Sequence, residues 1–253
     1  MGLTDEQYRK FANLTFDDLR RMAQDESLSP NEKIGFPDSY RKGKEGLIFQ
    51  SIVANLPLLN AKGKAVLDVG PGCGELPRLM IDHCRDHQHQ LLLVDSQEML
   101  AQLPDGDFVR KFPAFYPQCE PLFREYSSKV DVLLTYSVVH TVFVEANLWD
   151  FLDGSLQLLA EGGEMLIGDI PNISMRKRFF SSAHGIKFHQ QFMNVETAPE
   201  VEFNCLERRQ IDDAVILGLI SRARSQGFDA YVLPQPPGLP FANRREDVLI
   251  RRP

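Results

Sequence analysis

The chain contains 253 residues, of which 43% are hydrophobic and 25% charged, and its formal net charge at pH 7 is −7. This composition is typical of a soluble globular protein, and the length suits one large domain or a domain with a cap. The acidic balance argues against a long nucleic-acid partner, because phosphate binding depends on clustered Lys and Arg side chains.

The cysteines and the hydropathy pattern indicate the compartment. The four cysteines are far apart and form no CxxC pair, which argues against a zinc site and against a disulfide framework. The first residues are polar, and no apolar run reaches the roughly 20 residues that a membrane span needs. We therefore expect a cytoplasmic protein with no membrane partner and no bound metal. The sequence is compatible with a homodimer.

Residues 1–60 are predicted to form a helical cap or lid. The stretch "TFDDLRRMAQDE" has Thr15 in the position of a helix N-cap and acids in its first turn. Pro30, Gly35 and Pro37 then interrupt the helical pattern, and a second helix is expected over residues 44–55.

From residue 64 onward, short apolar runs alternate with helical stretches. The runs "AVLDVG", "QLLLVDS", "DFVRKF", "VDVLLTYS" and "GEMLIGDI" are typical of strands that are buried on both faces. The alternation predicts an α/β fold, with a doubly wound, mostly parallel sheet over residues 61–253. Residues 171–206 are predicted to be an irregular insertion that lines a substrate pocket. A helix over 207–226 and a hairpin of "FDAYVLPQ" and "EDVLIRR" are expected to follow.

The loop after the first predicted strand, "DVGPGCG", is rich in glycine. In an open α/β sheet this loop is the usual position of a cofactor. A phosphate-binding loop of the form GxxxxGK[ST] is excluded because Glu75 and Leu76 follow Gly74. The dinucleotide fingerprint GxGxxG requires a glycine where the chain has Glu75, an acid that opposes pyrophosphate binding.

The same stretch matches the pattern DxGxGxG and resembles the cofactor loop of class I S-adenosylmethionine-dependent methyltransferases. The similarity extends over about residues 64–169 and 228–251, and it implies a seven-stranded Rossmann-like sheet. It also implies that the cofactor, whose product form is S-adenosylhomocysteine, lies against Asp68, Gly70, Pro71, Gly72, Gly74, Asp95, Ser96, Met99 and Tyr136. In this resemblance Asp68 faces the cationic amino end and Asp95 accepts hydrogen bonds from the ribose. Met99 packs on the adenine or is an ordinary core residue.

One stretch departs from the family pattern. Many members carry an acid after the third strand that binds the adenine amino group, whereas this chain has "RKFPAFYPQ". We expect the adenine to meet backbone groups near Ala114 and to stack on Phe115.

The methyl acceptor is expected to be a small molecule. The stretch "TYSVVH" lacks the [DN]PPY pattern that accompanies methylation of base amino groups, and no cysteine lies close enough to the fourth or fifth strand for a covalent route. His140, just beyond the fourth strand, is the first candidate base, since a neutral imidazole can take a hydroxyl proton. His189 is a second candidate and His184 a candidate substrate ligand. A helix-capping or buried histidine is an equal alternative for His140.

The basic stretch "MRKRFF" places Arg176 and Arg178 after the fifth strand, where arginines suit a phosphate on the acceptor. Together with "EKIGFPDSY", this stretch faintly resembles methyltransferases of bacterial surface-polysaccharide biosynthesis. Tyr40 and Arg41 are candidate substrate-binding residues, expected either to close over the cofactor as part of a lid or to lie on the surface.

The predicted function is S-adenosylmethionine-dependent methylation of a small molecule, with O-methylation of a phosphorylated or nucleotide-activated sugar as the specific form. The alternatives are a nicotinamide-dependent oxidoreductase, an RNA methyltransferase that uses the local basic clusters, and a non-catalytic protein that keeps the fold.

Overall fold

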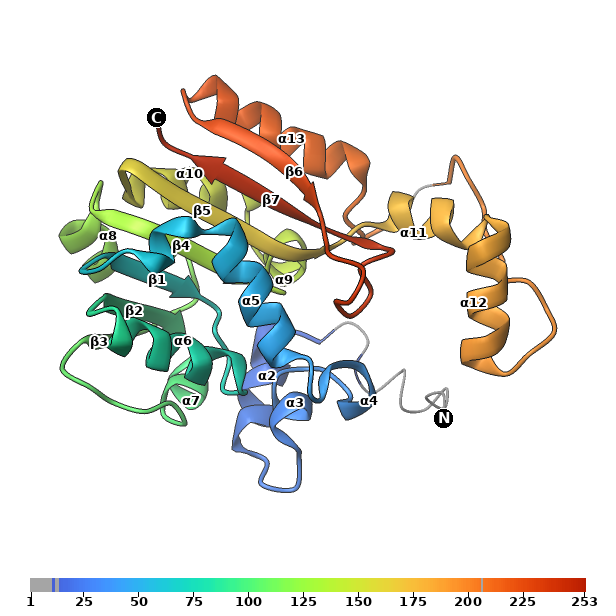
Figure 1. The fold of residues 1–253 in the computed structure, drawn as a ribbon, viewed down its shortest axis with the longest axis horizontal. Coiled ribbons are helices and arrows are strands. Elements are labelled where there is room, and N and C mark those ends of the chain that lie inside the picture. Colours follow the sequence, from blue (N-terminus) through green and yellow to red (C-terminus); the bar gives the residue numbers. More distant parts are fainter. Residues whose placement is uncertain (1–10, 12–13, 206) are drawn as a thin grey trace.

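The computed structural model describes residues 11, 14–205 and 207–253, and its centre is one seven-stranded sheet (Figure 1). The strands stand in the order β3-β2-β1-β4-β5-β7-β6. Their bounds are β1 Ala65–Val69, β2 Gln90–Asp95, β3 Val109–Pro113, β4 Val130–Tyr136, β5 Leu159–Pro171, β6 Asp229–Pro234 and β7 Arg245–Arg251. Each run that was expected to form a strand does so.

The strand directions agree with the predicted mixed sheet. The five strands β1 to β5 pair in parallel, whereas β7 is antiparallel to both β5 and β6. The pairing of β5 with β7 shifts register between Ile167 and Ile170, so the carboxyl end of β5 carries a bulge. The predicted doubly wound, mostly parallel α/β fold and the closing hairpin are confirmed.

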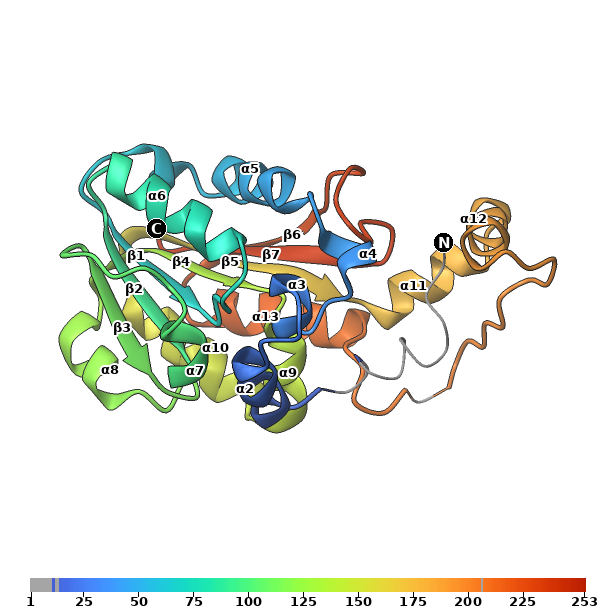
Figure 2. The same ribbon diagram turned by 90° about the horizontal axis from the view of Figure 1, so that it is seen from below.

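Helices cover both faces of the sheet, as Figure 2 shows. One apolar cluster joins the sheet to α5 (Glu45–Asn55), the 3-10 turn η1 (Pro57–Asn60) and α6 (Leu76–Asp86). The other joins it to α8 (Glu120–Tyr126), α9 (Val139–Glu145), α10 (Leu148–Leu158) and α13 (Asp213–Ser225). Burial on both faces explains why the inner strands β1, β2 and β4 are almost continuously apolar.

The described part of the segment before β1 contains the α-helices α2, α3, α4 and α5. Thr15 caps α2 (Phe16–Gln24) through a capping box with Asp18, as predicted. The helices α3 (Pro30–Lys33) and α4 (Asp38–Arg41) follow, and a small cluster of Ala23, Cys73 and Met99 packs the segment against the glycine loop and α7 (Gln97–Leu100). The predicted second helix is α5, which packs on the sheet. The cap over the site therefore consists of α2 to α4, while residues 1–10 and 12–13 of the predicted cap lie outside the described residues.

The insertion differs from the prediction of an irregular segment. It contains two helices, α11 (Ile173–Phe180) and α12 (Ala183–Met193), and α12 projects from the body of the molecule (Figures 1 and 2). The helix α13 begins at Asp213, with Asp212 as its N-cap, and not at residue 207. Residues 195–205 and 207–212, between α12 and α13, contain only bends, turns and irregular backbone. In the described part of the chain no helix has the length and apolar character needed to cross a membrane.

Candidate functional site

The carboxyl ends of β1, β2 and β4 meet beneath the cap, and two adjoining cavities lie there. The first cavity contains about 830 Å³ of empty space, including its opening, and the second about 1280 Å³. Five side chains line both cavities: Leu19, Ile34, Phe36, Ser137 and Thr141. The two cavities are therefore neighbours that share one wall.

The glycine loop forms the floor of the first cavity. Gly70 and Gly72 have φ angles of +71° and +69°, which side chains other than glycine rarely adopt. A Cβ atom on Gly70 would lie 2.5 Å from Val138 Cγ2, and one on Gly72 would lie 2.7 Å from Ile34 Cγ2. Both positions therefore require glycine, because of the backbone conformation and of the close approach of neighbouring side chains.

Asp95, at the end of β2, holds this loop in place. Its Oδ2 atom accepts a hydrogen bond from the Gly72 amide at 2.9 Å, and its Oδ1 atom accepts one from the Ser96 amide at 2.6 Å. Burial raises the pKa of Asp95 to about 6, although both hydrogen bonds act in the opposite direction. The carboxylate therefore fixes the loop and lines the cavity at the same time.

Asp68, near the end of β1, is a buried carboxyl group without a compensating partner. It is 4% exposed, and among the described residues no group donates a hydrogen bond to it. Burial, followed by the nearby charge of Asp95, raises the pKa of Asp68 to about 8. A carboxyl group with such a pKa in a cavity marks a candidate binding site for a cation.

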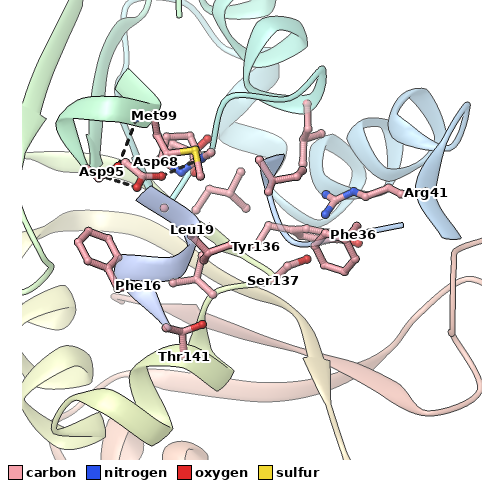
Figure 3. Close-up of a pocket in the computed structure, with 18 residues that line it drawn as sticks. Phe16, Leu19, Phe36, Arg41, Asp68, Asp95, Met99, Tyr136, Ser137 and Thr141 are labelled. Atoms are coloured by element: carbon pink, nitrogen blue, oxygen red, sulfur yellow. Dashed lines mark hydrogen bonds between the residues drawn. The ribbon is translucent and has the colours of Figure 1, made fainter. Parts of the chain in front are cut away.

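The apolar wall of the first cavity comes from both the sheet and the cap (Figure 3). Met99 is 3% exposed and lies beside Leu19 of α2, while Phe16 contacts Phe115 edge-on at 4.9 Å between ring centroids. Figure 3 shows Phe16, Leu19 and Met99 on the same side of the pocket as the two carboxyl groups. This group offers an apolar surface that suits a planar ring.

The residues predicted for the cofactor divide between the cavity and its surroundings. Those that line the first cavity are Asp68, Gly70, Pro71, Gly72, Asp95, Ser96, Met99 and Tyr136. Gly74, Ala114 and Phe115 do not line it. The Ala114 amide is occupied by the Asp95 carbonyl at 3.0 Å, and Phe115 reaches the cavity only through Phe16.

Arg41, predicted as a lid residue, also lines the first cavity. Its side chain extends from the end of α4, is 6% exposed, and lies between the rings of Phe36 and Tyr136. The buried Nε atom has no hydrogen-bond partner. Burial lowers the pKa of this guanidinium from its usual range. Tyr40, the neighbouring residue, lines the second cavity instead.

The second cavity is lined by apolar residues and by several polar and charged groups. The cap contributes aliphatic and aromatic side chains, and α9 contributes Val144. The polar and charged residues that line it include Ser137, His140, Thr141, Glu145, Arg209, Gln210 and Arg245. The composition is typical of a small-molecule pocket in which a few polar groups orient the ligand.

A hydrogen-bonded group stands where the two cavities meet. Ser137 Oγ donates a hydrogen bond to Asp169 Oδ2, which also pairs with Arg245 Nη1 at 2.5 Å. Ser137 and Asp169 have φ angles of +61° and +60°, in the left-handed region that non-glycine residues rarely occupy. Two such residues in contact at a cavity point to a functional constraint on this backbone.

His140, the predicted base, lines the second cavity from the first turn of α9. Its buried Nδ1 atom has no hydrogen-bond partner in the described structure. Burial, and then the positive charge of Arg245, lower the pKa of His140 to about 4. The imidazole is therefore neutral at physiological pH and can accept a proton or a hydrogen bond.

The other predicted acceptor residues lie outside both cavities. His184 is exposed on α12, and His189 packs edge-on against Phe180 at 6.0 Å. Arg178 is paired with Asp213 of α13 at 2.5 Å, and Arg176 stacks over Phe180 at 5.1 Å. The structure does not bring these four side chains to the site. The described residues contain no cluster of three or more potential metal-binding side chains.

Several residues of the site were not identified from the sequence. They are Phe16, Leu19, Ile34, Phe36, Ser137, Thr141, Asp169 and Arg245. For Ser137, Thr141 and Asp169 a signal existed, because each follows or ends a strand at the edge where ligands bind. For the cap residues the sequence gives only an amphipathic pattern, and their contact with the glycine loop is a long-range relationship.

Comparisons with known proteins give a consistent fold. The plantazolicin methyltransferase BamL, solved with a triazolic desmethylPZN analog and S-adenosylhomocysteine, has a TM-score of 0.56 at 12% identity over 94% of this chain and 96% of that chain. The CurJ carbon methyltransferase has a TM-score of 0.54 at 16% identity, over 98% of this chain and 68% of that chain. A SAM-dependent methyltransferase from Aquifex aeolicus has a TM-score of 0.54 at 12% identity, over 89% of this chain and 100% of that chain.

These identities are too low to carry more than the architecture, so the chain has the class I methyltransferase fold. No protein-family model matches the sequence, and no curated protein resembles it at the level of sequence.

Proposed function

We propose that the protein is an S-adenosylmethionine-dependent methyltransferase that acts on a small molecule. The observation that carries the proposal is the first cavity, in which Gly70 and Gly72 at positive φ, the uncompensated Asp68 carboxyl and the loop-holding Asp95 stand together. The fold of the structural neighbours agrees with it.

The residues of the first cavity fit this cofactor. Asp68 suits the cationic amino group, because a buried carboxyl with a raised pKa is stabilised as an anion by a neighbouring ammonium group. Asp95 suits the ribose hydroxyls, since each of its oxygens has a lone pair left after one amide bond. Phe16, Leu19 and Met99 suit the adenine ring. When bound, the cofactor supplies a methyl group on a positively charged sulfur.

The second cavity is the proposed acceptor pocket. Its apolar cap residues would exclude water from the junction, while Ser137 and Thr141 line both cavities. With its hydroxyl hydrogen directed at Asp169, Ser137 keeps lone pairs that can accept a hydrogen bond from the acceptor. His140 is neutral at physiological pH and is the proposed proton acceptor for a hydroxyl nucleophile.

This lining favours an acceptor that is mostly apolar or aromatic and carries a hydroxyl group. The more specific prediction, a phosphorylated or nucleotide-activated sugar, relied on Arg176 and Arg178, which lie elsewhere. Arg209 and Arg245 are the arginines that line the pocket, and Arg245 is already paired with Asp169. We therefore place phosphorylated sugars second and attach no weight to the resemblance to polysaccharide enzymes.

A transfer assay tests this function. The protein is incubated with S-adenosylmethionine labelled in its methyl group and with separate panels of hydroxylated aromatic compounds, phosphorylated sugars and RNA. We expect label transfer to the first panel, and loss of transfer in a His140→Phe variant that still binds S-adenosylhomocysteine, since His140 lines the second cavity and not the first. Transfer confined to RNA would contradict the proposal, as would saturable binding of a nicotinamide cofactor without binding of S-adenosylhomocysteine. Cofactor binding with no transfer to any panel would favour the non-catalytic alternative.

A further inference from the structure

Arg41 is a buried guanidinium without a fixed partner, at the edge of the first cavity. The side chain is 6% exposed, with the guanidinium carbon 4.8 Å from the centroid of Phe36 and 5.7 Å from that of Tyr136. Its Nε atom is buried and makes no hydrogen bond to any residue that the structure describes. Burial of a cation without an anionic partner is costly, so such a residue indicates a ligand.

The nearest acids do not neutralise Arg41. Asp169 is already bound by Arg245 at 2.5 Å and by Ser137, and it acts on Arg41 only at longer range. Glu45 is buried, but its Oε2 atom has no hydrogen-bond partner, and within the described residues no ion pair includes Arg41. The positive charge is therefore available to an anion that enters the first cavity.

The opposite charge stands on the other side of the same cavity. In Figure 3 Arg41 enters the pocket from the side of α4, whereas Asp68 and Asp95 enter from the strands across it. Asp68 is itself a buried carboxyl without a hydrogen-bonding partner. A cavity that holds a carboxyl group and a guanidinium, each without a hydrogen-bonded partner, is complementary to a zwitterion, the form in which an α-amino acid exists at neutral pH.

From this geometry we infer that Arg41 binds the carboxylate of the amino-acid end of the cofactor, while Asp68 binds its ammonium group. The inference rests on the proposed function and adds a specificity-determining residue to it. A carboxylate on the acceptor is the other possible source of the anion. Arg41 lines the first cavity and not the second, which favours the cofactor.

This contact would also tie the cap to the cofactor. Arg41 is the last residue of α4, and the segment just before it supplies Ile34, Phe36 and Tyr40 to the acceptor pocket. A carboxylate held by Arg41 would therefore draw the walls of the second cavity into position. The cofactor would have to bind before the acceptor pocket is complete.

Three ligands test the inference by isothermal titration. S-adenosylhomocysteine carries both charges, its decarboxylated analogue keeps only the ammonium group, and 5′-methylthioadenosine carries neither. We expect the wild-type protein to bind S-adenosylhomocysteine about 10- to 100-fold more tightly than the decarboxylated analogue, the range that a charge-assisted hydrogen-bonded pair supplies. Arg41→Met should remove this preference and leave the affinity for the decarboxylated analogue within about threefold.

One control variant and one further measurement accompany the titration. Arg21→Met removes an exposed guanidinium from the same cap, where it pairs with Asp18, and should leave all three affinities unchanged. Hydrogen exchange over residues 30–41 should slow with S-adenosylhomocysteine and not with 5′-methylthioadenosine.

The outcomes separate the inference from the proposed function. Equal binding of S-adenosylhomocysteine and its decarboxylated analogue by the wild type would overturn the inference and leave the cofactor proposal standing. Equal weakening of both ligands by Arg41→Met would assign Arg41 a structural role and overturn it as well. Failure of the wild type to bind any of the three ligands would overturn both. If Arg41→Met does not fold, the wild-type comparison alone decides.

Discussion

The Asp95 carboxylate and the Gly72 amide are joined by a hydrogen bond of 2.9 Å between the ends of β2 and the loop after β1. The same carboxyl group accepts a bond from Ser96 and lines the first cavity. The loop conformation and the proposed ribose contact thus depend on one side chain. This explains why an acid at the end of the second strand accompanies the glycine pattern here.

Asp95→Asn tests this double role. An asparagine has one acceptor oxygen and one amino group, so a donor would face the amide of either Gly72 or Ser96. We expect affinity for S-adenosylhomocysteine to fall at least about tenfold, since an unsatisfied buried donor costs about 1–3 kcal/mol. Asp105→Asn, on an exposed carboxyl outside the cavity, is the control. Equal affinities in the Asp95 variant and the wild type would refute the role.

Gly72→Ala tests the closure of the cap over the loop. The new methyl group would meet Ile34 Cγ2 at 2.7 Å, in a backbone with φ +69°. We expect a loss of about 1–3 kcal/mol in stability and weaker cofactor binding. The double variant Gly72→Ala, Ile34→Ala should recover part of the loss because it removes the contact but not the strain. Gly63→Ala is the control for backbone strain without a close contact, because Gly63 has a φ angle of +67° and an added Cβ would have no atom within 4 Å. If it were as damaging as Gly72→Ala, the contact with Ile34 would be irrelevant.

Asp68→Asn should stabilise the ligand-free protein at neutral and higher pH. The folded-state pKa of about 8 lies above the unfolded value of about 3.9, so the folded state binds more protons between these values. The stability of the wild type therefore falls as the pH rises from about 4 to 8. The Asp68→Asn variant has no carboxyl group to ionise at this position and so lacks this pH-dependent loss of stability. Its melting temperature should exceed that of the wild type by several degrees at pH 8. A lower melting temperature for the variant at pH 8 would contradict the assignment.

Binding of a cationic group to Asp68 should release a proton. At pH 7 the carboxyl is mostly protonated in the free protein and must ionise to pair with an ammonium group. Titrations with S-adenosylhomocysteine in buffers of different ionisation enthalpy should therefore report release of about one proton at pH 7. The Asp68→Asn variant should bind more weakly and release much less. Proton uptake on binding would be incompatible with this role.

His140→Phe should separate cofactor binding from transfer. His140 lines only the second cavity, so affinity for S-adenosylhomocysteine should stay within about threefold while transfer falls about 10²-fold or more. The pKa of about 4 lies below the unfolded value of about 6.5, so the wild type loses stability as the pH falls through this interval. The His140→Phe variant should lose less stability over the same pH interval. Unchanged transfer in His140→Phe would exclude it as the base.

The sequence predicted the features that depend on neighbouring residues. The strands β1, β2 and β4 are short apolar runs, Thr15 and Asp18 form their capping box within one turn, and the glycine pattern follows β1 directly. The helix α12 also had a local signal, because Phe188 and Phe192 are four residues apart and stack. The polar composition around them concealed it.

Features that depend on distant residues were not predictable. Arg178 was expected at the acceptor site, but Asp213, which lies 35 positions later in the chain, binds it. The contact of Ile34 with Gly72 and the bond between Ser137 and Asp169 likewise join segments that only the tertiary fold brings together. The acceptor pocket therefore differs from the prediction more than the cofactor cavity does.

Isothermal titration with S-adenosylhomocysteine tests the central claim most directly, with the Gly72→Arg variant and the nicotinamide cofactor NAD as controls. We predict saturable one-to-one binding to the wild type, no binding to the variant because its side chain would fill the floor of the cavity, and no binding of NAD. Mass spectrometry of the denatured protein would first show whether a cofactor has copurified and must be removed. Binding of NAD without binding of S-adenosylhomocysteine would contradict the account.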